Sequence, residues 1–288
     1  MVGDPIADLF AAGGKRLRPA LVLLAAKLGH FDLAQLAPAA MAVEITHAAT
    51  LVHDDVIDRA RLRRGRPTVA AAQGNESAIV VGDYYLVKAY ELAARTKSPE
   101  VVAILARAVM SICAGEVRQY QLRHRYRPSI DEYMQWIHDK TATLLAACCE
   151  IGAVLGGLDQ QQRNALREYG IDLGLAFQIA DDVIDYTGSE RQVGKPVGHD
   201  LVEGFATLPL MLGIERGVIE PIADGTRLTA DEARRIAERV RESDAAELAL
   251  RRAREFASRA RDELSVFAES EARATLSALT EYVVSRTF

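Results

Sequence analysis

The sequence lacks the features of several common protein classes. Its 288 residues include only three cysteines, too few for a disulfide framework, so we expect a reducing, cytoplasmic location. Proline is scarce, with nine residues, and aromatic residues make up 6% of the chain, with a single tryptophan. The N-terminus has neither the basic nor the apolar region of a signal peptide, and no uncharged apolar run is long enough to span a membrane.

The charge balance excludes a further class. The chain has 40 acidic and 35 basic residues and a formal net charge of −5, which argues against a general nucleic-acid binder. Hydrophobic residues make up 49% of the chain and charged residues 26%, enough to bury a sizeable core. No linker or shift in composition divides the sequence, and we therefore expect a single domain over residues 1–288.

Helical signals recur along the whole chain. We predict helices over Ala20–Leu28, from Pro38 to Asp58 or Arg59, and from Asn75 to about Ala94. Further starts are marked by Ser98-Pro99-Glu100 and by capping boxes at Ser129–Glu132 and Thr229–Glu232. Because no run of alternating β-branched residues is present, the sequence predicts an all-α bundle of about ten helices.

One five-residue pattern occurs twice. Asp-Asp-Val-Ile-Asp stands at Asp54–Asp58 and again, letter for letter, at Asp181–Asp185. On a helix the first and last aspartates of each copy lie about 6 Å apart along the axis, on one face. Two such faces opposed across a bundle need a cation, and all-oxygen ligands suit Mg²⁺, which takes further ligands from phosphates. The alternative, two solvated helix ends, is disfavoured by the apolar residues beside and within each copy.

Basic residues accompany the aspartates. They are Lys15, Arg16 and Arg18 after Gly13-Gly14; Arg61, Arg63, Arg64 and Arg66 after the first motif; and Lys140 and Lys195 on either side of the second. Guanidinium groups bind phosphate oxygens bidentately, and aromatics for stacking nucleic-acid bases are missing here. A site with both carboxylates and arginines predicts a ligand that combines metal and diphosphate.

The motifs together resemble a known family, the trans-polyprenyl diphosphate synthases of the class I isoprenoid synthases. The matching segments, in the expected order, are Gly13-Gly14-Lys15-Arg16-Leu17-Arg18-Pro19, His47 to Gly65, Gly115-Glu116, Lys140-Thr141 and Gly174 to Pro209. They cover nearly the whole chain. Terpene cyclases share the first aspartate motif but carry a second motif of Asn/Ser/Glu type, which Asp181–Asp185 is not.

The resemblance implies a fold and a set of site residues. The two motifs would face each other at the mouth of a deep apolar cavity, with three Mg²⁺ ions once the diphosphate is bound. Asp54, Asp58 and Asp181 would be the principal metal ligands, supported by Asp55, Asp182 and Asp185. Isopentenyl diphosphate would be held by Lys15, Arg18, His47 and Arg64, and the allylic diphosphate by Arg63, Lys140, Thr141, Gln178 and Lys195. Lys140 and Lys195 join the six aspartates as expected catalytic residues, and a homodimer through helix faces is implied.

The implied reaction is elongation of a prenyl chain. An allylic diphosphate such as farnesyl or geranylgeranyl diphosphate ionises with the help of Mg²⁺, isopentenyl diphosphate attacks the cation, and a proton is lost without a dedicated side-chain base. Geranylgeranyl diphosphate synthase is the alternative. A terpene cyclase and a regulatory subunit of a heteromeric synthase are more distant ones.

Small residues before the first motif predict a long product. Successive turns behind Asp54 carry Ala49 and Thr50, then Thr46, and a helical turn of about 5.4 Å is close to one isoprene repeat. Since no bulky aromatic closes these levels, we expect roughly six to ten isoprene units, and contact with a membrane during product release. Two departures from the family are Phe205, where many members have lysine, and the few residues before Gly13, where a further helix is usual.

Overall fold

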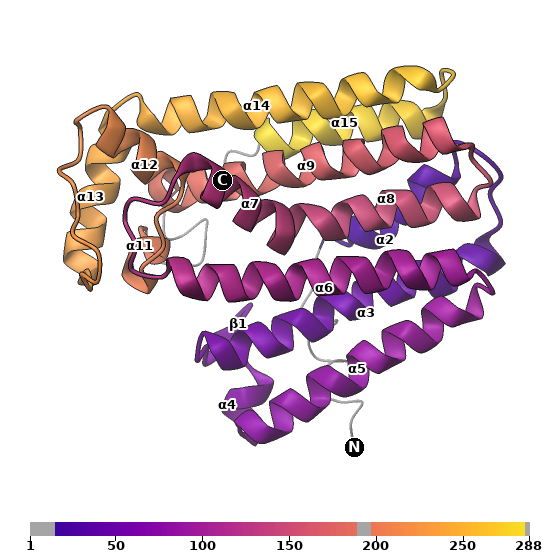
Figure 1. Ribbon diagram of the computed structural model, residues 1–288, viewed down its shortest axis with the longest axis horizontal. Coiled ribbons are helices and arrows are strands. Elements are labelled where there is room, and N and C mark those ends of the chain that lie inside the picture. Colours follow the sequence, from indigo (N-terminus) through magenta and orange to yellow (C-terminus); the bar gives the residue numbers. More distant parts are fainter. Residues whose placement is uncertain (1–14, 189–196, 286–288) are drawn as a thin grey trace. The chain divides into compact units, whose positions relative to one another are not determined.

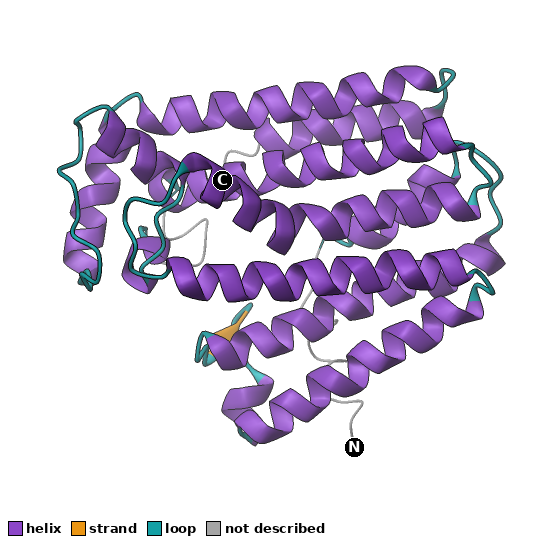
Figure 2. Cartoon of the chain, in the orientation of Figure 1, coloured by secondary structure: helices purple, strands orange, loops and turns teal. Residues whose placement is uncertain are grey.

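The computed structural model describes residues 15–188 and 197–285, which are mostly helical (Figures 1 and 2). The chain divides into two compact units: unit 1 comprises Met1–Val109 and Ala147–Arg163, and unit 2 comprises Met110–Ala146 and Asn164–Phe288. Helices α6 (Pro99–Leu122), α8 (Thr143–Leu155) and α9 (Gln160–Thr187) contribute residues to both. The predicted all-α class is confirmed, whereas the single domain stays a prediction.

Unit 1 contains the first aspartate motif. Its further elements are α2 (Leu17–Ala26), α3 (Leu33–Ile57), β1 (Leu62–Arg63), β2 (Arg66–Pro67), α4 (Val69–Gln73) and α5 (Asn75–Arg95). Strands β1 and β2 pair antiparallel around Arg64 and Gly65, whose φ angles are +52° and +75°. Two successive left-handed residues make the tight turn that matches the twist of a hairpin. The sequence did not predict this hairpin, because two-residue strands are too short to alternate.

The start of α3 differs from the prediction. The helix begins at Leu33, where the Asp32 carboxylate accepts a hydrogen bond from the Ala34 amide at 2.9 Å, and Pro38 lies inside it. The side-chain cap sets the boundary, and Pro38 lies beyond the first turn, where it removes one intrahelical hydrogen bond and crowds the Ala34 carbonyl. The capping boxes at Ser129 and Thr229, by contrast, begin α7 (Ile130–Ile137) and α13 (Ala230–Glu242) as predicted.

Small residues bring the helices of unit 1 close together. A Cβ atom on Gly152 of α8 would lie 2.3 Å from the carbonyl oxygen of Val22 on α2, and one on Gly156 would lie 3.0 Å from the Cα atom of Ala26. Val22, Ala25 and Ala26 are fully buried. The backbones of α2 and α8 therefore pack in contact, and any larger side chain at Gly152 would separate them.

Unit 2 contains the second aspartate motif. Besides α7 and α13 it holds the π-helical turn η1 (His138–Ala142), α11 (His199–Glu203), α12 (Leu208–Glu215), α14 (Ala245–Glu263), η2 (Leu264–Val266) and α15 (Glu271–Ser285). The Tyr169 hydroxyl of α9 donates to the Leu276 carbonyl of α15 at 2.8 Å. On the same helix the buried Asp172 pairs with Arg259 of α14 at 3.1 Å. These contacts fix α9, which carries the motif, against α14 and α15.

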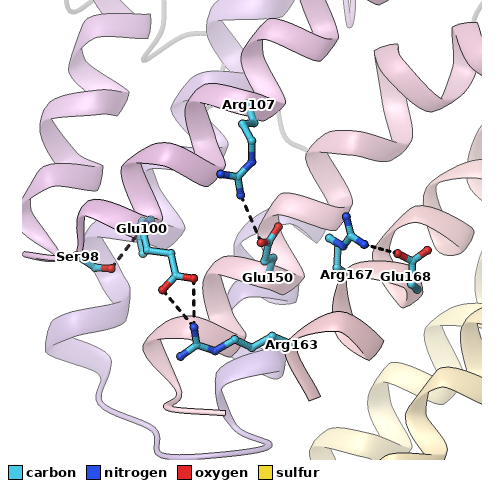
Figure 3. A network of polar contacts seen from close by, with 8 residues as sticks. Ser98, Glu100, Arg107, Glu150, Arg163, Arg167 and Glu168 are labelled. Atoms are coloured by element: carbon cyan, nitrogen blue, oxygen red, sulfur yellow. Dashed lines mark hydrogen bonds and ion pairs between the residues drawn. The ribbon is translucent and has the colours of Figure 1, made fainter. Parts of the chain in front are cut away.

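Ion pairs join the first turns of α6 to the start of α9 within unit 1 (Figure 3). Arg163 donates to both carboxylate oxygens of Glu100, at 3.2 and 3.1 Å, and to the Leu158 carbonyl at 2.8 Å. Two turns further along α6, Arg107 pairs with Glu150 of α8 at 3.5 Å (Figure 3). Such half-exposed pairs fix geometry more than they add stability. Across residues 15–188 and 197–285, no helix has the length and apolarity needed to cross a membrane.

Candidate active site

A basic loop begins the described part of unit 1. Arg16 has a φ of +50° and precedes α2, and its guanidinium group pairs with Glu44 of α3 at 2.6 Å. Arg18 lies in the first turn of α2, where its Nε atom is buried without a hydrogen-bond partner among the described residues. Burial also lowers the pKa of Arg18. An orphaned, buried guanidinium nitrogen is a donor that an anionic ligand could satisfy.

His47 lies in the field of this basic loop. Burial is the main cause that holds its pKa well below the usual value, and the positive charges of Arg18, Arg64, Arg63 and Arg16 add to it. The imidazole is therefore neutral at pH 7. Four arginines act on one buried position of α3, which is the charge distribution that a diphosphate would neutralise.

The first aspartate motif stands at the C-terminal end of α3. The helix ends at Ile57 with Asp58 as its C-cap, so the carboxylates lie at the negative end of the helix dipole. Asp55 is buried and accepts a hydrogen bond from Arg63 Nε at 2.7 Å. Burial raises the pKa of Asp55, and the Arg63 charge opposes that rise. The hairpin that follows α3 thus places Arg63, which is predicted to bind the allylic diphosphate, against the first aspartate motif.

A histidine that the sequence analysis passed over connects this motif to α5. His53 Nε2 lies 3.2 Å from the Ile79 carbonyl oxygen and 3.4 Å from an Asp83 carboxylate oxygen. A Cβ atom on Gly82 would lie 2.2 Å from the same ring nitrogen, so only glycine leaves room for the ring. The residue immediately before Asp54 is therefore held against α5.

The second motif is built around a buried carboxylate. Asp182 accepts hydrogen bonds from the Tyr133 hydroxyl at 2.6 Å and from the Gln178 amide at 2.8 Å, one on each oxygen. Burial, followed by the charges of Asp200 and Asp181, raises its pKa well above the usual value. With a donor on each oxygen, Asp182 suits a supporting role better than direct metal coordination. Asp200 and Tyr133 were not singled out from the sequence, since their contacts join distant segments.

Lys140 and Thr141 lie in the π-helical turn. The Thr141 hydroxyl donates to Gln178 at 2.8 Å, so the turn and the second motif belong to one hydrogen-bond network. The Lys140 ammonium group pairs with Glu116 at 2.6 Å and donates to the Gln119 side chain at 2.7 Å. Single-turn π segments often mark functional sites. The sequence motif contained Glu116 but gave it no role, and Gln119 was missed.

Two further positions, Lys195 and Phe205, concern the cations expected at the allylic site. Lys195 lies outside the described residues. Phe205, where a lysine was expected from the resemblance, places its ring 5.6 Å from the Trp136 ring, and the Arg123 guanidinium group lies 5.8 Å above it. The position has thus become part of an aromatic contact.

The predicted chain-length residues lie on α3. Thr46 and Ala49 are buried, and the Thr50 hydroxyl donates to the His47 carbonyl at 2.8 Å. The Thr46 hydroxyl is buried without a partner among the described residues. A cavity of about 220 Å³ in unit 2 has none of the predicted site residues in its lining, which is Tyr126, Arg127, Pro128, Ile130, Met211, Ile214 and Glu215. The deep cavity implied by the resemblance stays a prediction.

The aspartate carboxylates fit a metal ion that binds together with the substrate diphosphate. Within the described ranges, no three His, Cys, Asp or Glu side chains are grouped closely enough to hold a metal ion by themselves. Mg²⁺ does not need such a cage, because it is usually bound by one or two carboxylates, substrate phosphates and water. In unit 1 the first aspartate motif, with Arg63 bound to Asp55, provides both carboxylates for the metal and a cation for the phosphate.

Comparison with known proteins identifies the family. The polyprenyl synthetase family model matches residues 1–238. Component 2 of the heptaprenyl diphosphate synthase of Bacillus subtilis (strain 168) is 34% identical over 97% of this chain and 81% of its own, and the octaprenyl diphosphate synthase of Haemophilus influenzae is 36% identical over 96% and 85%. The crystal structure of the Caulobacter crescentus CB15 polyprenyl synthase, complexed with calcium and isoprenyl diphosphate, is 42% identical with a TM-score of 0.90, over 96% of this chain and 86% of that one. The chain belongs to the polyprenyl synthetase family.

Proposed function

We propose that this protein is a trans-prenyltransferase that adds isopentenyl diphosphate units to an allylic diphosphate and releases a medium- or long-chain polyprenyl diphosphate. Family membership supports the reaction class, and two relatives, a component of a heptaprenyl diphosphate synthase and an octaprenyl diphosphate synthase, support the product range. The observation that carries the proposal lies in unit 1, where Arg63 binds Asp55 of the first aspartate motif and the Arg18 Nε atom is buried without a partner among the described residues. A terpene cyclase would have no use for a second diphosphate site.

The residues divide the work of binding between two substrates. Lys15, Arg18, His47 and Arg64 bind isopentenyl diphosphate; the orphaned Arg18 nitrogen and the neutral His47 imidazole are both suited to donate to its oxygens. Arg63, Lys140, Thr141, Gln178 and Lys195 bind the allylic diphosphate. Bidentate guanidinium contacts and point-charge lysines fix the leaving group before the carbon–oxygen bond breaks.

Asp54, Asp58 and Asp181 would hold Mg²⁺, with Asp55, Asp182 and Asp185 in support. When bound, the metal supplies positive charge that stabilises the departing diphosphate. The calcium in the Caulobacter crescentus structure shows that a divalent cation accompanies isoprenyl diphosphate in that relative. Around this point the protein's own side chains orient the leaving group and keep water from the carbocation.

Two aspartate variants test the proposal. Asp54→Asn and Asp181→Asn should each lower transfer of radiolabelled isopentenyl diphosphate onto farnesyl diphosphate by about a hundredfold or more, since charge stabilisation contributes at least that factor. Asp262→Asn, an exposed position on α14, is the matched control and should transfer at the normal rate. EDTA should abolish transfer by the normal protein. Normal rates in both motif variants would contradict the proposal.

We also infer that the protein acts as a homodimer. On α6, Met110, Val117 and Tyr120 are 64%, 60% and 72% exposed and share one face, because their spacings are seven and three. On α5, Val80, Tyr84 and Val87 form a second, separate exposed apolar stripe. Contiguous apolar surface of this kind favours association. Light scattering should give twice the chain mass, and Val117→Glu should shift the measured mass toward that of the monomer.

We infer a cytosolic location, which suits the free cysteines of the described chain.

A further inference from the structure

The Lys140 ammonium group is held by two oxygens of α6. Its Nζ atom lies 2.6 Å from Glu116 Oε2 and 2.7 Å from Gln119 Oε1. The Gln119 amide in turn lies 3.3 Å from the other Glu116 oxygen. Lys140 and Glu116 are mostly buried and Gln119 is fully buried, so the three side chains form one enclosed network. This network fixes the position of the Lys140 ammonium group before any ligand binds.

Gln119 is itself fixed from the opposite side. The Trp136 indole N–H donates to the same Oε1 atom at 3.2 Å. The Trp136 ring packs edge-on against Tyr133 and, tilted, against Phe205. Aromatic pairs of this kind restrict ring orientation. Phe205 is therefore linked to Gln119 through Trp136.

The backbone places Lys140 within reach of α6. The π-helical turn His138–Ala142 adds a residue to the helical register, and Gly115 stands opposite it. A Cβ atom on Gly115 would lie 2.7 Å from the Lys140 amide nitrogen, so the turn approaches α6 as closely as glycine permits. Glu116 and Gln119, one and four residues further along α6, then lie within reach of the ammonium group.

The ammonium group keeps donors for a ligand. It has three N–H donors, of which Gln119 accepts one in the described part of the chain, while Glu116 faces it as an ion pair without hydrogen-bond geometry. Lys140 is 23% exposed at its side chain, enough for an incoming anion to reach it. Pre-ordering a long, flexible side chain removes an entropy cost from ligand binding.

We propose that Glu116, through its ion pair, and Gln119, through its hydrogen bond, are positioning residues that fix the Lys140 ammonium group so that a remaining N–H donor meets the allylic diphosphate. This inference rests on the proposed function, in which Lys140 binds that substrate. Neither residue contacts the substrate in this account. They affect binding of the allylic diphosphate only through the position of Lys140. Swapping the carboxylate of Glu116 and the amide of Gln119 tests this inference.

The experiment compares four variants at saturating Mg²⁺ and isopentenyl diphosphate. Glu116→Gln removes the carboxylate, Gln119→Glu adds a second one, and the double variant restores one carboxylate and one amide facing Lys140. Gln121→Glu, exposed on the same helix, is the matched control for the added charge. The readouts are kcat/KM for farnesyl diphosphate, KM for isopentenyl diphosphate and the thermal midpoint.

We expect each single variant to lose about tenfold or more in kcat/KM for farnesyl diphosphate, the size of a charged hydrogen bond. The double variant should recover to within about threefold of the normal protein, since coupled positions are not additive. KM for isopentenyl diphosphate should stay unchanged, and Gln121→Glu should behave normally.

Three outcomes would overturn the inference: lower thermal midpoints with unchanged allylic kinetics, a double variant as poor as the two losses combined, or a lower allylic KM in Glu116→Gln. The last would show that the carboxylate merely competes with the diphosphate. Lys140→Met separates the two levels of the argument. If it transfers normally, the role of Lys140 in the proposed function is wrong; if it is impaired while Glu116→Gln and Gln119→Glu are normal, only the positioning fails.

Discussion

Replacing Gly115 with alanine perturbs the contact between α6 and the π-helical turn. The new Cβ atom would lie 2.7 Å from the Lys140 nitrogen, 3.0 Å from its Cα atom and 3.1 Å from the Asp139 carbonyl carbon. All three are backbone atoms, which cannot rotate away, so the turn must move by about 0.7 Å to reach ordinary contact. Overpacking of this kind costs about 1–3 kcal/mol of unfolding free energy. Displacement of Lys140 and Thr141 should lower allylic kcat/KM by about tenfold to a hundredfold.

The control for this variant is Gly213→Ala on α12 of the same unit. There the nearest atom to a new Cβ is Ile219 Cγ1 at 3.2 Å, a side-chain atom that needs to move by only a few tenths of an ångström. Alanine in a helix also gains up to about 1 kcal/mol over glycine, so this variant should keep stability and activity. Chemical denaturation and steady-state kinetics measure both. A Gly115→Ala protein with normal stability and normal allylic kinetics would refute the packing argument.

Three further predictions concern product length, pH and the aromatic contact. Ala49→Phe should shorten the product seen by chromatography, because it fills the first level behind Asp54; unchanged length would refute the assigned path. Burial raises the pKa of Asp172 from 3.8 to about 6. The contribution of its protonated carboxyl group to the stability of the fold is therefore fully present below pH 3.8 and is lost as the pH rises through 6. Asp172→Asn should therefore gain stability relative to the normal protein between pH 4.5 and 7.5, by about 2 kcal/mol; a pH-independent difference in denaturation would contradict this. Phe205→Ala should lower the thermal midpoint through lost contact with Trp136, at a cost of about 1–3 kcal/mol in calorimetry; an unchanged midpoint would count against that contact.

Local signals in the sequence were sufficient for much of the fold. The capping boxes at Ser129 and Thr229 depend on residues three apart, and both helices begin where predicted. The predicted start of α3 at Pro38 was wrong, because the Asp32 side chain caps the helix before Leu33 and Pro38 lies inside it. The π-helical turn at His138–Ala142 could not be predicted, since its residues also fit an ordinary helix and its register depends on the close approach of Gly115.

The candidate site divides in a similar way. Aspartates and basic residues within motifs could be assigned roles from the resemblance, because position along a motif is visible in sequence. The partners of those residues could not. Tyr133 lies 49 residues from Asp182 and Gln119 lies 21 from Lys140, so only the fold brings their polar atoms together. Phe205 was interpreted as a lost cation, whereas its ring contacts Trp136.

Transfer and product length can be measured in one incubation. The protein is supplied with radiolabelled isopentenyl diphosphate, farnesyl diphosphate and Mg²⁺, and the dephosphorylated lipids are separated by chain length. The account predicts a ladder that ends at roughly six to ten isoprene units, because the residues predicted to set chain length behind Asp54 are small. A ladder that stops at four units would keep the chemistry but contradict the open path, and the absence of any elongated lipid would contradict the central claim that this chain alone is a prenyltransferase.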